Sequence, residues 1–374
     1  MARSLTRDEV LRHRLRSQQL TGPRAPAVAE VARRMAAIQA QSTRDARLAV
    51  RPRGQGIDAA AVTEACNVTR SVVRTWAMRS TLQMLARQDV GWIVDLFRPP
   101  AGLVTARHRQ LGLDAGLFAR ALPAIAELLS GRGPLTRAEL VAGLATRGVA
   151  VDPKTQAPAH LIGYAARQGV ICRGPDRGDD EPTYVLLADW AGEHAPVEPD
   201  AALAELARRY AAAHGPASPA DFGYWSGLPL GRARRGFELV AGELEEVDAA
   251  GDRAWMLTAG DGPAPGPGPG HPAPCVRLVP HFDEYLLGYR SRDIMLEPRF
   301  ARRIQAGGGW VRAAVLVDGR VAGTWRQQRH GDRTVVTVEP FEAIGPAALP
   351  GLEAEAADLG RFQRTAASLR IAPG

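Results

Sequence analysis

Residues 134–148 read PLTRAELVAGLATRG, and this stretch carries the clearest local structural signal in the chain. Thr136 and Glu139 have the spacing of a capping box, in which each side chain accepts a hydrogen bond from the backbone N–H of the other residue. Apolar residues then recur at the spacing of one helix face. We therefore predict a helix that begins directly after Thr136.

Two further helices and a hairpin are predicted around this helix. PAIAELL (123–129) precedes it as an apolar helix, and APAHLIGYAARQ (157–168) follows it as another. Two strand-like runs, GVICRG (169–174) and TYVLLA (183–188), then flank a polar loop. Three helices followed by a hairpin is the order of a winged helix, which we predict for residues 121–197.

The same order recurs loosely on both sides of this region. Before it, helices are predicted at 27–37, 43–50 and 58–66, with paired strands in SVVRTWAMRSTLQML (71–85). After it, LAELARRYAAAHG (203–215) is a helix, SPADFGYWSG begins with a Ser-Pro helix start, GRARRGFELVAGELEEV (231–247) follows, and DRAWML (252–257) returns as a strand. Residues 1–120 and 198–260 are therefore predicted as two further winged helices.

A β-rich domain is predicted at residues 275–374, beyond the Pro/Gly-rich linker AGDGPAPGPGPGHPAP (259–274). The Asp-Gly pair in AAVLVDGRVAGTW lies between alternating apolar residues and predicts a hairpin. The expected fold is thus α+β, with three tandem winged helices followed by a C-terminal β-barrel-like domain.

Basic side chains are concentrated in the first third of the chain. Residues 1–130 carry 20 Arg against 10 acidic residues, a net charge of +10, and the remainder carries 27 basic against 30 acidic residues, a net charge of −3. Such an excess is typical of a surface that binds a polyanion, because phosphate neutralisation supplies most non-specific affinity for DNA. A solvated surface without a partner is the alternative.

Several other classes of protein are disfavoured. No apolar run reaches the about 18 residues of a membrane-spanning helix, and the first residues lack the apolar segment of a secretion signal. Cys66, Cys172 and Cys275 are too far apart for a disulfide framework or a paired metal site. The eight histidines have no metal-ligand spacing. We expect a cytoplasmic protein with no membrane partner, no metal and no other cofactor.

Gln39 and Gln41 are separated by one residue in IQAQSTRDARLAV, within the basic region. Residues i and i+2 diverge on a helix but point the same way in an extended segment. Ser42 or Thr43 is suitably placed to cap the next helix. We therefore predict an extended connection between two helices, with both amides on one side. Two surface glutamines in a turn are the alternative.

Three blocks of the sequence resemble motifs of the AlkZ-type winged-helix DNA glycosylases. IQAQ (38–41) is similar to that family's Gln-x-Gln motif. VVRTWAMRSTLQML (72–85) is similar to its Arg-Thr-Trp-x-Met-Arg-Gly-Thr-Leu-His stretch, and PHFDEYLLGYRSRD (280–293) to its Pro-x-Phe-Asp-Glu-Tyr-Leu-Leu-Gly-Tyr-Arg-Asp-Arg block. Gln41 places the chain in the Gln-x-Gln branch, which includes self-resistance enzymes of antibiotic producers.

The resemblance has two departures. Ser80 stands where the family usually has glycine, and Gln83 stands where it usually has histidine. Any role that the family assigns to that histidine is therefore not carried over to this chain.

The resemblance implies excision of alkylated purines from DNA, chiefly N7-alkylguanines, including bulky natural-product adducts and interstrand crosslinks. An N7-alkylated guanine already carries positive charge, so the base departs without protonation. The enzyme then has to position a water at C1′ and stabilise a partial positive charge on the sugar. Amide oxygens can do both without a shifted pKa. We assign this catalytic role to Gln39 and Gln41.

The only lysine, Lys154, lies in the second predicted winged helix, away from the Gln-x-Gln motif. A Schiff base needs an amine. We therefore expect a hydrolytic, monofunctional enzyme without lyase activity.

The predicted contacts with DNA come from three segments. Arginines after the Gln-x-Gln motif should meet phosphates rather than bases, and arginines of the second block should line the DNA side. The hairpin TWRQQRHGDRTV is a candidate minor-groove wedge, with a solvated hairpin tip as the alternative. The predicted residues are Arg44, Arg47, Arg51, Arg53, Arg74, Arg79, Arg326, Gln327, Gln328, Arg329, His330 and Arg333.

Other polar and aromatic residues are interpreted as structural. Asp283 and Glu284 suggest an acid/base pair, but adjacent residues diverge on any regular element and their neighbours are apolar. Asp45 is a possible general base near the glutamines, although a role in the first turn of a helix is preferred. Trp76 is assigned to the core.

The alternative functions are a winged-helix transcriptional regulator without catalysis and a module that sequesters a drug. A regulator usually dimerises and reads a palindrome. The chain has no heptad repeat or other obvious dimer helix, and three different modules suit a monomer that wraps a lesion. We therefore expect a monomer whose partner is double-stranded DNA with alkylated purines.

Overall fold

The computed structural model describes residues 3–178, 181–258 and 273–373. Of the predicted linker 259–274, all but the last two residues lie outside the described part of the chain. No helix in the described part is both long and apolar enough to cross a membrane.

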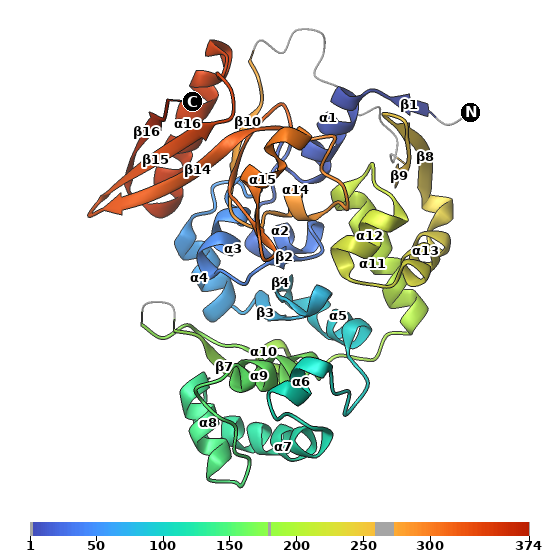
Figure 1. Cartoon of the computed structure of the whole chain (residues 1–374), viewed down its shortest axis with the longest axis vertical. Helices are drawn as coiled ribbons and strands as arrows, with labels where there is room; N and C mark the ends of the chain where they lie inside the picture. Colours follow the sequence, from blue (N-terminus) through green and yellow to red (C-terminus); the bar gives the residue numbers. More distant parts are fainter. Residues whose placement is uncertain (1–2, 179–180, 259–272, 374) are drawn as a thin grey trace. The chain divides into compact units, whose positions relative to one another are not determined.

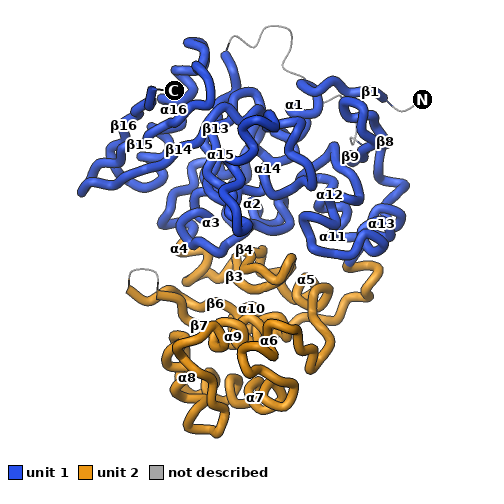
Figure 2. Tube along the Cα trace, viewed as in Figure 1, with its two compact units in different colours: residues 1–62, 203–374 blue, residues 63–202 orange. Residues whose placement is uncertain are grey.

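The chain forms two compact units, each of which combines helices with strands (Figures 1 and 2). Unit 1 contains residues 1–62 and 203–374, and unit 2 contains residues 63–202. Helices α4 (Ala59–Asn67) and α11 (Pro199–His214) cross the two boundaries. The predicted α+β class is confirmed, while the four predicted domains stay a prediction.

Unit 2 is mainly helical and has short antiparallel strands. Its helices are α5 (Val90–Phe97), α6 (Ala106–Gln110), α7 (Ala115–Arg132), α8 (Arg137–Ala145), α9 (Ala157–Arg167) and α10 (Leu187–Ala191). Its strands are β3 (Val72–Trp76), β4 (Leu82–Ala86), β5 (Leu135–Thr136), β6 (Ile171–Arg173) and β7 (Thr183–Leu186). β3 pairs with β4, and β7 pairs with both β5 and β6, all antiparallel.

The order of elements predicted around residues 134–148 is confirmed. α8 begins after Thr136, whose side chain accepts from Glu139 N at 3.2 Å while the Glu139 carboxylate accepts from Thr136 N at 2.7 Å. Helices α7, α8 and α9 are then followed by the hairpin of β6 and β7. The capping box defines where α8 begins because it satisfies backbone N–H groups that have no partner inside the helix.

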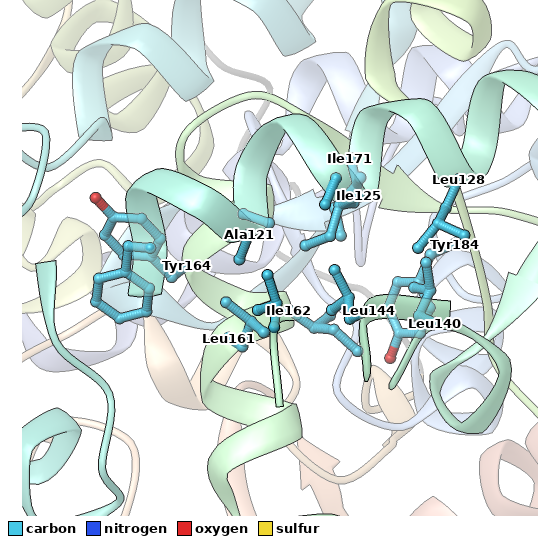
Figure 3. Packing of buried hydrophobic residues seen from close by; sticks show 14 of the residues in the cluster. Ala121, Ile125, Leu128, Leu140, Leu144, Leu161, Ile162, Tyr164, Ile171 and Tyr184 are labelled. Carbon is cyan, nitrogen blue, oxygen red and sulfur yellow. The ribbon is translucent and has the colours of Figure 1, made fainter. Parts of the chain in front are cut away.

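The core of unit 2 is formed by the apolar faces of these helices (Figure 3). Ile125 and Leu128 of α7 lie on the same face as Ala121, because residues three and four apart share a helix face. α8 contributes apolar residues with the same spacing. At Gly143 an added Cβ would lie 2.7 Å from the Leu128 side chain, so a larger residue there would require Leu128 to shift.

Unit 1 holds the remaining helices and most of the strands. The helices are α1 (Arg7–Ser17), α2 (Val28–Arg34), α3 (Thr43–Val50), α12 (Pro219–Ser226), α13 (Leu230–Leu239), α14 (Glu284–Leu287), α15 (Ala301–Ile304) and α16 (Leu349–Gln363). The strands are β1 (Arg3–Leu5), β2 (Ile38–Gln39), β8 (Leu244–Ala249), β9 (Asp252–Leu257), β10 (Val276–Val279), β11 (Gln305–Gly307), β12 (Trp310–Val311), β13 (Ala314–Val317), β14 (Arg320–His330), β15 (Arg333–Pro340) and β16 (Ala366–Ile371).

The C-terminal strands form a curled half-barrel sheet that is open at both edges, in the order β10-β13-β14-β15-β16. Helix α16 packs against β10 and β16 (Figure 1). The predicted Asp-Gly hairpin joins β13 to β14. Asp318 and Gly319 both have positive φ, 50° and 80°, which suits a two-residue turn between twisted strands.

The N-terminus completes a second sheet in unit 1. β1 pairs in parallel with β8, which pairs with β9 in the hairpin of residues 244–257. The segment 231–247 therefore contains both α13 and the start of β8, and the predicted strand DRAWML is confirmed as β9.

Residues 281–289, which are buried from Asp283 onward, connect the parts of unit 1. Both terminal nitrogens of Arg53 bind the Asp283 carboxylate, at 2.8 and 2.7 Å, and neither side chain is more than 1% exposed. Arg53 also donates to the backbone oxygens of Gln18 at 3.1 Å and Ala49 at 2.8 Å. A single guanidinium thus joins the ends of α1 and α3 to this segment.

Tyrosines extend the same connections. The hydroxyl of Tyr285 donates to Gly319 O, and that of Tyr289 donates to His214 O, each at 2.9 Å. Tyr210 of α11 donates to Gly288 O at 2.7 Å. Burial raises the pKa of all three hydroxyls, so they remain neutral donors.

Replacing Arg53 with alanine should lower the free energy of unfolding of unit 1 by about 3–5 kcal/mol, because it leaves the Asp283 charge buried without its partner. The control is Arg320→Ala, which removes an exposed ion pair with Asp8 and should cost less than about 1 kcal/mol. Urea unfolding followed by circular dichroism measures both. Equal losses in the two variants would contradict this account of the segment.

Candidate active site

The Gln-x-Gln motif lies in an extended connection between α2 and α3. Gln39 ends the two-residue strand β2 and is only 9% exposed, whereas Gln41 is exposed and Ala40 between them is buried. The two amides meet, because Gln39 Nε2 donates to Gln41 Oε1 at 3.2 Å. The predicted geometry, with both amides on one side of an extended segment, is therefore confirmed.

A buried carboxylate holds the backbone of this motif. Glu284 is 1% exposed, and its Oε1 accepts from Gln39 N at 2.9 Å. Its Oε2 accepts from the indole N–H of Trp225 at 2.8 Å, and its backbone oxygen accepts from Gln18 Nε2 at 3.2 Å. Because both carboxylate oxygens receive N–H donors, Glu284 is a positioning residue. The interpretation of Asp283 and Glu284 as structural is confirmed.

Helix α3 begins immediately beyond the motif. The side chain of Ser42 accepts from Asp45 N at 3.2 Å, which caps the helix as predicted. Asp45 lies in the first turn, where a carboxylate interacts favourably with the helix dipole. Arg44 in the same turn is exposed, and Arg47 is half-buried. Both remain predicted DNA contacts.

The prediction that Arg51 and Arg53 meet phosphates is wrong. Arg51 is fully buried and binds Glu355 and Asp358, each at 2.6 Å. Arg53 is occupied by Asp283. A buried guanidinium requires an anionic partner because removing it from water is costly. Here distant acidic residues provide that partner, so neither arginine can bind DNA.

The same correction applies to Arg74 in the β3–β4 hairpin of unit 2. Arg74 is 4% exposed and binds Asp176 at 2.7 Å and Gly174 O at 2.9 Å. Arg79, at the tip of this hairpin, is half-buried with a φ of 52° and remains a predicted DNA contact. Gln83, at the usual histidine position, is buried and donates to Thr81 Oγ1 at 2.7 Å.

The predicted wedge is the end of the β14–β15 hairpin, which runs to a projecting tip (Figure 1). Gln328, Arg329, His330 and Arg333 are exposed around the turn at Gly331. These side chains are available to a ligand, and their role in DNA binding stays a prediction.

Two residues of β14 that are farther from the hairpin tip have partners within unit 1. Arg326 is exposed but binds Glu339 at 3.0 Å, and Gln327 Oε1 accepts from Gln363 Nε2 of α16 at 2.9 Å. Contacts of these two side chains with DNA therefore compete with interactions inside the protein.

The basic excess of the first third is partly neutralised by local contacts. Arg33 and Arg34 both bind Glu30 at 2.7 Å, and the hydrogen bonds from these arginines lower the pKa of Glu30 to about 2. With Arg51 and Arg53 also paired, the positive surface around the glutamines is smaller than the sequence count suggests.

Sequence reasoning did not find the residues that position the glutamines. Trp225 and Gln18 are separated from Gln39 by 186 and 21 positions in the chain, and neither belongs to a recognisable motif. No local signal marks them, because their role depends on the fold of unit 1. Within the described ranges, no three His, Cys, Asp or Glu side chains are grouped so that they could hold a metal ion.

The chain is similar to known DNA glycosylases over nearly its full length. A family model described as DNA glycosylase AlkZ-like matches residues 32–362. A curated relative, the interstrand DNA cross-link repair glycosylase of Streptomyces sahachiroi, is 30% identical over 365 residues, which cover 94% of this chain and 95% of the relative. The solved structure of Streptomyces sahachiroi DNA glycosylase AlkZ is 28% identical with a TM-score of 0.81, and the match covers 99% of this chain and 100% of that one. The chain therefore belongs to the AlkZ-like DNA glycosylase family.

Proposed function

We propose that this protein is a monofunctional DNA glycosylase that hydrolyses the N-glycosidic bond of N7-alkylguanine and related alkylpurines in double-stranded DNA. The observation that carries the proposal is the contact between the amides of Gln39 and Gln41 on a backbone held by Glu284. The curated relative is named for repair of interstrand crosslinks. We extend that substrate class to this chain, with bulky natural-product adducts, as base excision repair in self-resistance.

Neutral amides suit this reaction because the leaving group is already cationic. When the C1′–N9 bond breaks, its electron pair neutralises the alkylated base, and the sugar becomes an oxocarbenium-like cation. A water then attacks C1′ and loses a proton to solvent. Amide oxygens can accept hydrogen bonds from that water and stabilise the sugar cation, and an amide does not ionise near neutral pH.

The contact between the amides leaves Gln41 with capacity for a ligand. An amide group has two N–H donors and two acceptor lone pairs, and the bond from Gln39 occupies one lone pair of the Gln41 oxygen. Gln41 is also exposed, so its amide can meet a nucleotide. Glu284 places a buried carboxylate beside the backbone of Gln39, which favours positive charge developing nearby.

The proposed architecture is three tandem winged helices and a C-terminal β-barrel-like domain. Its support is that three helices followed by an antiparallel hairpin occur three times in the chain. The runs are α2, α3 and α4 with β3–β4, then α7, α8 and α9 with β6–β7, and finally α11, α12 and α13 with β8–β9. We propose that the protein acts as a cytoplasmic monomer on chromosomal DNA, with phosphates contacted by Arg44, Arg47, Arg79 and the β14–β15 hairpin.

Gln39→Ala and Gln41→Ala should each lower the single-turnover rate of N7-methylguanine release from duplex DNA by about 10²–10³-fold, because each removes a polar group placed at the reacting sugar. Released base can be measured by mass spectrometry. The matched control is Gln55→Ala, which removes an exposed glutamine side chain of the same unit. Wild-type rates in both motif variants would refute the assignment.

The product should be a free abasic site, and borohydride should not trap a covalent adduct between the protein and DNA. The only lysine in the sequence is Lys154, which is exposed, and the proposed reaction uses no amine. Gel electrophoresis after reaction with and without borohydride tests this. A trapped adduct that persists in Lys154→Ala would indicate a different nucleophilic amine, and an adduct absent in that variant would identify the lysine.

Replacing Arg329 and Arg333 together with glutamine should weaken duplex binding and flatten its dependence on salt. The slope of log K against log salt should fall by about 0.9 for each phosphate that the variant no longer neutralises. Substitution is preferable to deletion here, since Gln327 of the same hairpin is bonded to α16. The control is Arg253→Gln, an exposed arginine of β9 that pairs with Glu246. An unchanged salt slope would exclude the hairpin from DNA binding.

A further inference from the structure

The short β11–β12 hairpin of unit 1 presents an exposed tryptophan. Trp310 is 47% exposed, although a tryptophan usually buries most of its large apolar surface. Three glycines precede it, with φ values of 90°, 59° and 79°, and a Cβ added at any of them would meet no atom within 4 Å. These glycines are required by the turn, and they leave its tip without side chains that would obstruct a ligand beside Trp310.

The tryptophan ring packs against two other aromatic rings. Its ring lies 4.7 Å from that of Phe282 at an interplanar angle of 73°, and 5.4 Å from that of His281. The backbone N–H of Phe282 donates to Val311 O at 3.2 Å, and His281 Nδ1 accepts from Ala313 N at 3.1 Å. Trp310 is thus an ordered aromatic surface, which loses little conformational entropy when a ligand stacks on it.

The hairpin is anchored on the same segment as the glutamines. Phe282 supports Trp310, and two residues later Glu284 binds the backbone N–H of Gln39. Two residues of extended chain span at most about 7 Å. The supports of the aromatic ring and of the Gln-x-Gln motif are therefore neighbours in space.

Positive charge surrounds the hairpin. Arg302 and Arg312 are exposed, and neither forms an ion pair with any residue that the structure describes. An aromatic surface with exposed arginines near it in the chain is an arrangement by which proteins hold unstacked bases, since phosphates bind the cations while a base stacks on the ring.

We propose that Trp310 is a stacking platform for a planar heterocycle displaced at the lesion, with Arg302 and Arg312 on the flanking phosphates. The heterocycle is either an unpaired base of the damaged duplex or the planar portion of a bulky adduct. This inference rests on the proposed function, because it assumes that the protein binds damaged DNA. A measurement of DNA binding tests it independently of catalysis.

The test measures binding of the full chain to a duplex that carries an abasic-site analogue opposite a normal base, and to the matched intact duplex. Trp310→Ala should weaken binding to the abasic duplex by about 5- to 100-fold, and binding to the intact duplex much less. Trp310→Phe should retain most of the affinity because it keeps an aromatic face. Leu230→Ala, which trims a side chain of similar exposure (45%) in the same unit, should bind as the wild type does.

A parallel assay distinguishes the two sources of the heterocycle. Single-turnover excision is compared for N7-methylguanine and for a planar aromatic N7 adduct. If Trp310→Ala weakens binding to the abasic duplex and slows release of N7-methylguanine, a DNA base is the stacked ring. If it slows only release of the planar adduct, the adduct is the stacked ring. Either result supports the platform.

Wild-type affinity and wild-type excision by Trp310→Ala on every substrate would overturn it. If the wild-type chain excised nothing, yet Trp310→Ala still bound the abasic duplex more weakly, the proposed reaction would fail and the platform would stand. Unfolding midpoints equal to that of the wild type confirm that Trp310→Ala is folded.

Discussion

The ion pair between Arg53 and Asp283 is the interaction on which the rest of unit 1 depends. Both groups are buried, so each is tolerable only because the other neutralises it and oxygens of Gln18 and Ala49 accept the remaining guanidinium hydrogens. The pair fixes the position of residues 281–289 against the ends of α1 and α3. Glu284, the next residue, is then placed to bind the backbone of Gln39. The geometry of the amide pair is in this sense a consequence of a structural ion pair beside it.

In the proposed reaction, the charged side chains are separate from the side chains that act on the substrate. The carboxylates are buried and occupied, and the groups that face the proposed substrate are amides whose charge does not change with pH. Such a site is weak for an ordinary nucleotide, whose neutral base needs an acid in order to leave. Under the proposed mechanism it suffices for a base that alkylation has made cationic, because the lesion itself provides the driving force for bond cleavage. The enzyme would then discriminate alkylated from normal nucleotides by the reactivity of the cationic base as well as by the shape of the site.

The number of arginines in the sequence does not tell which of them contribute positive charge to the surface, because some are buried in ion pairs. Arg44 and Arg51 are seven residues apart at the two ends of α3, yet one is exposed and the other is fully buried between Glu355 and Asp358. The family-like hairpin of β3 and β4 likewise turns Arg74 inward to Asp176. The exposed cations include Arg329, Arg333, Arg302 and Arg312. Arg302 of α15 and Arg312 lie on either side of the β11–β12 hairpin in the sequence, and no motif marks them.

The sequence alone determined the local elements and the class of chemistry. The capping box at Thr136, the cap at Ser42 and the Asp-Gly turn depend on neighbouring residues, so their physics is contained in short windows. The tertiary structure decided which arginines are buried, that Glu284 and Trp225 hold the motif, and that Trp310 is exposed against His281 and Phe282. These outcomes depend on partners up to about 300 residues away, and an interaction of that kind leaves no periodicity or spacing by which a single sequence could reveal it.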